Sequence, residues 1–140
     1  MVLELENLDK NSLIKLAHYF SINNNLQELL LECNVIEDNT HGTLFLESKI
    51  KDSIKFSIQR DSIDPALFSS ITFYQPNISI GELLDIYPIY HGAYIPYDEE
   101  YCYVFKSING KYNVTACINK AEENKDKRDQ LPNRLSIIFE

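Results

Sequence analysis

The stretch YCYVFKSINGKYNVTACI, residues 101–118, decides the fold, because two strand-like patterns meet there across a turn. Asn109-Gly110 is the dipeptide favoured by a two-residue type I′ turn, and such a turn fixes which residues of the two strands lie opposite one another. The predicted pairs are Phe105–Val114, Tyr103–Ala116 and Tyr101–Ile118 on one face, and Lys106–Asn113, Val104–Thr115 and Cys102–Cys117 on the other. The apolar pattern of each strand agrees with the register that the turn sets, so the sequence predicts an antiparallel hairpin.

On either side of this hairpin the spacing of apolar residues separates helices from strands. Leu13, Leu16, Ala17 and Phe20 follow the i, i+3, i+4, i+7 spacing of an amphipathic helix, whereas residues 53–59 alternate between apolar and polar in the manner of a half-buried strand. The expected helices cover residues 8–20, 23–33 and 79–88, and the further strands cover 42–50, 52–60, 69–75 and 134–140. The charged segment 119–133 is expected to be an exposed loop or one solvated helical turn. The chain therefore reads as a single α+β domain over residues 1–140, with a largely antiparallel β-sheet, two N-terminal helices and one short internal helix.

The acidic residues are unevenly distributed along the chain. The net charge is -8, and no lysine or arginine occurs between Arg60 and Lys106. That interval contains seven acids: Asp61, Asp64, Glu82, Asp85, Asp98, Glu99 and Glu100. Such a charge distribution repels nucleic acid and anionic membrane, and it favours a cationic protein partner.

Tyrosines are concentrated in the same interval, which holds seven of the nine in the chain. The segment YPIYHGAYIPYDEE, residues 87–100, is expected to be a loop held by two prolines and a glycine, with its tyrosines beside three consecutive acids. Tyrosine offers a large contact area at a low entropic cost and is enriched at protein interfaces. The expected partner-binding residues are Glu82, Asp85, Tyr90, Tyr94, Tyr97, Asp98, Glu99 and Glu100.

Enzymatic and metal sites are weakly represented in the sequence. It has no nucleophile elbow, no phosphate-binding glycine loop and no HxH or HExxH spacing, so we expect neither an enzyme nor a metal or other cofactor. The alternative is a small enzyme or ligand-binding domain in which His91 serves as a base within a tyrosine-lined pocket. Cys102 and Cys117 are placed opposite each other by the hairpin register. A redox-active disulfide is conceivable there, but paired thiols that pack as small apolar groups are the expected state.

The N-terminus has no cationic, apolar leader, and the chain has no apolar run of about 20 residues, so a cytoplasmic location is expected. In its size, acidity and tyrosine and carboxylate content, the whole chain resembles bacterial immunity proteins that neutralise toxin domains, including those of contact-dependent inhibition systems. Those toxins are often nucleases with basic active sites, so the resemblance implies a basic toxin as the partner. It assigns no role to individual residues. A phage or chaperone-like adaptor would use the same kind of interface with a different partner.

Overall fold

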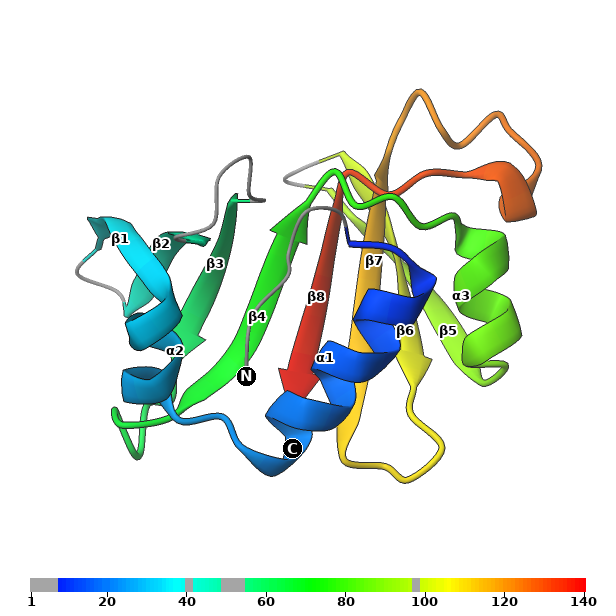
Figure 1. Cartoon of the computed structure of the whole chain (residues 1–140). Coiled ribbons are helices and arrows are strands. Elements are labelled where there is room, and N and C mark those ends of the chain that lie inside the picture. Colours follow the sequence, from blue (N-terminus) through cyan, green and yellow to red (C-terminus); the bar gives the residue numbers. More distant parts are fainter. Residues whose placement is uncertain (1–7, 40–41, 49–54, 97–98) are drawn as a thin grey trace.

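A computed structural model describes residues 8–39, 42–48, 55–96 and 99–140 of the chain. Its centre is an eight-stranded sheet in which every neighbouring pair of strands is antiparallel, in the order β1-β2-β3-β4-β8-β7-β6-β5 (Figure 1). The strands are β1 (Cys33–Asp38), β2 (Thr43–Ser48), β3 (Lys55–Arg60), β4 (Phe68–Tyr74), β5 (Tyr90–Ile95), β6 (Glu100–Lys106), β7 (Tyr112–Asn119) and β8 (Arg134–Phe139). The α+β class with a mainly antiparallel sheet is therefore confirmed.

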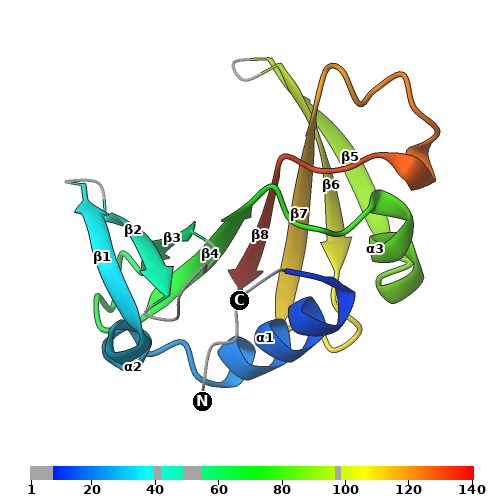
Figure 2. The ribbon, with the colours of Figure 1, turned by 45° about the horizontal axis from the view of Figure 1, so that its top comes forward.

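Three α-helices lie on one face of this sheet: α1 (Lys10–Ile22), α2 (Leu26–Glu32) and α3 (Ile80–Ile86). The two views in Figures 1 and 2 place α1 over the middle of the sheet, α2 beside β1, and α3 toward β5. A short 3-10 turn, Lys127–Asp129, lies next to α3. No helix of the described residues covers the opposite face of the sheet, so the two faces have different environments.

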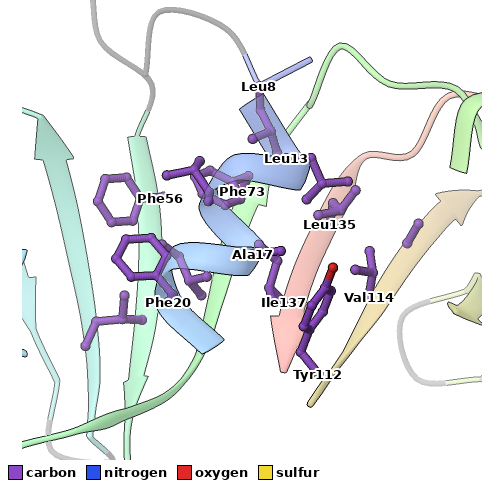
Figure 3. Close-up of a cluster of buried hydrophobic side chains, with 14 of the residues drawn as sticks. Leu8, Leu13, Ala17, Phe20, Phe56, Phe73, Tyr112, Val114, Leu135 and Ile137 are labelled. Atoms are coloured by element: carbon purple, nitrogen blue, oxygen red, sulfur yellow. The ribbon is translucent and has the colours of Figure 1, made fainter. Parts of the chain in front are cut away.

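The first helix attaches to the sheet through its apolar stripe. Asp9 caps the helix by accepting a hydrogen bond from the Ser12 backbone N–H at 2.8 Å. The four stripe residues predicted from the sequence are all buried: Leu13, Leu16, Ala17 and Phe20. They meet apolar side chains of β3, β4, β7 and β8 in the core shown in Figure 3. The Phe20 ring packs edge-on against Phe68, with 5.3 Å between the ring centroids.

The register of the predicted hairpin is confirmed for all six residue pairs between β6 and β7. The predicted type I′ turn of this hairpin, however, is wrong. Gly110 has φ +71°, but Asn109 does not have the positive φ that a type I′ turn requires. The Gly110 N–H instead donates to the Ser107 carbonyl, and the turn ends on glycine in the left-handed conformation. A different turn thus connects the strands in the same register, because side-chain burial on both strands sets the pairing.

Two strands were not predicted, and they form the two edges of the sheet. β1 follows directly on α2, and apart from Cys33, the last residue of the expected helix 23–33, no predicted element covered its residues. β5 occupies part of the segment predicted as a loop, and all six of its residues pair with β6, from Tyr90–Phe105 to Ile95–Glu100. Edge strands are exposed along one side, so their sequences lack the continuous apolar signal of an inner strand. The prolines at 88 and 96 bound β5 rather than bending a loop.

The last strand along the chain, β8, lies near the middle of the sheet between β4 and β7. Five residues of β8 pair with β4 and six with β7. Leu135 and Ile137 of this strand are fully buried beneath the helices. The two halves of the sheet, β1–β4 and β5–β7, are therefore joined through β8. Among the described residues, no helix is long and apolar enough to cross a membrane.

Candidate protein-binding surface

Residues 90–95 of the tyrosine-rich segment form the exposed edge strand β5. Alternation along the strand directs Tyr90 and Tyr94 to the face that carries the helices, and His91 and Ala93 to the opposite face. Tyr94 is 54% exposed although it is a large aromatic residue. Residues 91–94 are exposed along their whole run, so this edge is open to a partner.

Tyr90, Tyr101 and Tyr103 pack together, and Lys127 lies over the Tyr90 ring. Tyr103 lies against both Tyr90 and Tyr101, with ring centroids at 6.1 and 5.0 Å. The Lys127 ammonium donates to the Tyr90 hydroxyl at 2.8 Å and lies 5.3 Å from the centre of that ring. This hydrogen bond raises the pKa of Lys127, and burial raises the pKa of Tyr103. Tyr103 also donates to the Gln130 Oε1 at 2.7 Å, so its hydroxyl is already engaged in the fold.

The interval without bases in the sequence is not free of bases in space. The loop before β8 brings Arg128 to Asp85, and one guanidinium nitrogen lies 3.0 and 2.9 Å from the two carboxylate oxygens. Glu100 is only 6% exposed, and it pairs with Arg134 at 3.0 Å. The Glu100 carboxylate also accepts a hydrogen bond from the Asn133 side-chain amide at 2.7 Å. The expectation that Glu100 offers a free carboxylate to a partner is therefore wrong, because the sheet buries and pairs this group.

The remaining predicted residues are distributed as follows. Glu82 closes the capping box at the start of α3 with Ser79 and is half-buried. Glu99 is exposed at the β5–β6 turn, where it has a positive φ of 51°. Tyr97 and Asp98 lie outside the described residues. The structure thus leaves Tyr94 and Glu99 exposed on one hairpin, and it places Asp85 in an exposed ion pair on α3.

The alternative function requires a pocket in which His91 and neighbouring tyrosines face one another. His91 is exposed on the face of β5 opposite to Tyr90 and Tyr94. A hollow of about 230 Å³ does lie beside the tyrosines, but it is lined by Tyr101, Tyr103, Ile118, Glu123 and Gln130. Within the described ranges, no group of three histidines, cysteines or acids could hold a metal ion.

No family model, curated protein or solved structure matches the chain. Exposed apolar residues occur at several places, and among them Tyr94 lies on the edge strand β5, and Val35 and Ile36 lie on the edge strand β1.

Cys102 and Cys117 form a disulfide across β6 and β7. The expectation of two packed thiols is therefore wrong, although the facing positions from which a disulfide was considered are right. Both cysteines lie on the face opposite to the helices, and both are buried. The bond links β6 to β7, and β5 pairs with β6. The tyrosine-bearing edge strand is therefore attached to a cross-linked hairpin.

The opposite edge of the sheet carries an acidic and apolar surface that the sequence reasoning missed. Leu31, Val35 and Ile36 are 49–70% exposed between α2 and β1. The acids around them are Glu28, Glu32, Glu37 and Asp38. A hollow of about 400 Å³ beside β1 is lined in part by Ile36, Phe45 and Tyr74. Leu31 could have indicated this surface in the sequence, because it is apolar yet lies outside the buried stripe of α2, which contains Leu26 and Leu29.

Proposed function

We propose that this chain is a non-enzymatic inhibitor of the immunity-protein kind, which binds and neutralises a basic toxin domain, with a nuclease as the preferred class. It would act in the bacterial cytoplasm and without a cofactor. The observation that carries the proposal is the open β5 edge, where the exposed Tyr94 and the carboxylate of Glu99 belong to one hairpin.

Charge and chemistry support this choice of partner. A chain with net charge -8 attracts a basic protein over a distance and raises the rate of encounter. Tyr94 then supplies a rigid aromatic contact, and Glu99 supplies a carboxylate that can meet the phosphate-binding cations of a nuclease. Tyr97 and Asp98, which precede Glu99 in the sequence, remain part of the proposed contact.

The other proposed residues would act differently from the two exposed ones. Asp85 is already paired with Arg128, so a stronger cation on the partner would have to compete for that carboxylate. Tyr90 is covered by Lys127, and Glu82 is used in a helix cap, so these residues shape the flank of the surface. Glu100 supports the hairpin from inside through Arg134.

The test begins with capture of a partner from a lysate of the host at low salt, followed by an inhibition assay with the purified partner. A Tyr94→Ala/Glu99→Lys double variant is expected to lose at least tenfold in affinity, because it removes one aromatic contact and reverses one charge. Glu37→Lys makes the same charge change on the opposite edge and serves as the matched control. The control should bind within about twofold of the unaltered protein, after allowance for its smaller net charge.

Three results would contradict the proposal. The first is capture of an acidic protein. The second is binding that does not depend on salt concentration, because charge attraction would then not be the basis of binding. The third is loss of binding in Glu37→Lys with none in the double variant, which would move the contact to the β1 edge.

A further inference from the structure

The backbone of β5 has free hydrogen-bonding groups along its outer side. The Lys106 N–H donates to the Ile89 carbonyl at 3.0 Å, and Tyr90 lies opposite Phe105 in the register. Hydrogen-bonded and non-hydrogen-bonded positions alternate in an antiparallel pair. His91, Ala93 and Ile95 therefore direct their N–H and C=O groups toward β6. Three residues direct theirs away from the sheet: Tyr90, Gly92 and Tyr94.

Of these three residues, Gly92 and Tyr94 are exposed and Tyr90 is half-buried. Within the described residues, β6 is the only strand paired with β5. Gly92 and Ala93 are both exposed, and because their side chains are absent or a single carbon, much of that exposure belongs to the backbone. Neither of these two positions therefore shields the edge.

The two edges of the sheet differ in how they resist pairing with another strand. Sheet edges are normally protected by bulges, charges or prolines within the strand. At the β1 edge, the register shifts between Val35 and Glu37, and Glu37 and Asp38 add charge. β5 keeps one register over its six pairs and contains no lysine, arginine, aspartate or glutamate. Its prolines, at 88 and 96, lie just outside the strand.

We propose that the partner adds an extended segment of its own chain to the outer side of β5, exchanging backbone hydrogen bonds with Tyr90, Gly92 and Tyr94. This inference rests on the proposed function and names how the basic partner is held. Main-chain bonds would supply affinity, and side chains at alternate positions of the incoming strand would supply specificity.

Charge selects the occupant of the edge. Two copies of this chain, each with net charge -8, repel one another, whereas a basic chain is attracted. The incoming segment has uncharged residues against the strand and a lysine or arginine at the end that lies near Glu99.

The middle of the edge has a distinct shape. A Cβ added at Gly92 would lie 2.0 Å from the Tyr101 hydroxyl, so the Tyr101 side chain occupies the place of a side chain at this position. An incoming residue opposite Gly92 therefore meets the Tyr101 side chain, with Tyr90 and Tyr94 on either side on the same face. This arrangement favours an apolar or aromatic residue at the centre of the partner segment.

The first experiment uses the peptide Lys-Val-Thr-Val-Thr-Val-Lys, whose central residue is apolar, as the probe and records amide hydrogen exchange by NMR. The amides of Tyr90, Gly92 and Tyr94 are expected to exchange at least tenfold more slowly with saturating peptide, because each becomes a hydrogen-bond donor to the probe. A peptide with proline in place of its central valine should give no such protection. Absence of binding at millimolar peptide, protection mapped to other residues, or equal protection by the proline peptide would overturn the proposal.

A pair of variants isolates the backbone contribution. Tyr94→Ala removes the side chain and keeps the outward N–H, whereas Tyr94→Pro removes both. This N–H is not used within the sheet, so proline is compatible with the edge strand. The proline variant should bind the probe about fivefold more weakly than the alanine variant, the value of one net hydrogen bond. Both variants must retain the NMR spectrum of the β6–β7 hairpin. Equal affinity of two folded variants would overturn strand addition.

The charge of the partner is tested separately with Glu-Val-Thr-Val-Thr-Val-Glu. If this acidic peptide protects β5 as well as the basic peptide does, the basic occupant is wrong and strand addition stands. If instead the basic toxin is captured and inhibited but β5 is never protected, the proposed function stands and strand addition is wrong. Protection that grows with protein concentration in the absence of peptide would identify a second copy as the occupant and overturn the proposal.

Discussion

Single carboxylates in this chain have structural roles that their positions in the sequence conceal. Glu100 follows two other acids, yet it is buried against Arg134 and Asn133, whereas its neighbour Glu99 is exposed. The sequence distinguishes the two only through the pairing of the hairpin, because strand alternation and the approach of β8 decide which acid is enclosed. Charge counting along the chain therefore overstates the free negative charge of the tyrosine segment.

Replacement of Glu100 by alanine is expected to destabilise the protein by about 3 kcal/mol. The change removes a nearly buried carboxylate that pairs with the Arg134 guanidinium, and the value lies at the low end for broken buried pairs because the Arg134 side chain is 34% exposed. Urea unfolding measures the loss. Glu99→Gln, at the exposed neighbour, should change stability by less than about 0.5 kcal/mol. Equal effects of the two changes would contradict the assigned pairing.

Asp9 predicts a stability difference that depends on pH. Its carboxylate accepts the Ser12 N–H, and this bond lowers its pKa below the ordinary value. The cap therefore contributes above the unfolded-state pKa and is lost as the pH falls through the lower folded-state pKa. Asp9→Ala should cost about 1 kcal/mol at neutral pH and clearly less near pH 2.5, as measured by urea unfolding at both values. Asp9→Asn keeps a neutral cap, so its stability relative to Asp9→Ala should not fall with the pH.

The elements of secondary structure show what the sequence can and cannot predict. The β6–β7 register follows from local information, because turn position and two alternating patterns agree within eighteen residues. β5 could not be found in this way, since its exposed residues have no buried face to create a continuous pattern. The same limit applies to the prediction of the candidate site. Tyr94 and Glu99 were identified as surface residues, but the pairing of Asp85 with Arg128 joins segments 43 residues apart.

The disulfide predicts a redox-dependent stability of the β6–β7 hairpin. It closes a segment of 15 residues, for which the loss of unfolded-state entropy stabilises by about 3 kcal/mol. Cys102→Ala/Cys117→Ala is expected to lose up to this amount in urea unfolding. Dithiothreitol should lower the stability of the unaltered protein toward that of the double variant, and it should leave the double variant unchanged. An unaltered protein that is insensitive to dithiothreitol would show that the bond does not form in solution.

At the scale of the whole molecule, the sheet is asymmetric in two ways. In the part of the chain that the structure describes, the three α-helices cover one face, and the two edges differ in charge and regularity. The core beneath the helices runs from β2 to β6 without a break, and β8 connects its two halves. Damage to β8 should consequently affect the stability of both halves together.

Ile137 provides a test of this coupling. Its side chain is fully buried in β8, so Ile137→Ala should cost about 2–5 kcal/mol through the lost burial and the resulting cavity. Ile138, the next residue, is 40% exposed on the opposite face, and its replacement by alanine should cost much less. Circular dichroism and tyrosine fluorescence should give the same unfolding midpoint for Ile137→Ala, because both halves depend on β8. Two separate transitions would contradict the coupling.

The place of β8 also bears on how the protein is made. A ribosome delivers β1 to β7 first, and each half of the sheet can form its own antiparallel meander during synthesis. Until residues 134–139 emerge, however, β4 and β7 each have one unpaired edge. These two edges must not pair with each other if β8 is to insert between them. The nascent chain thus passes through a stage with two vacant inner edges, at which premature joining of β4 to β7 competes with correct insertion. The complete sheet can therefore form only after β8, which is synthesised after the other seven strands, has left the ribosome.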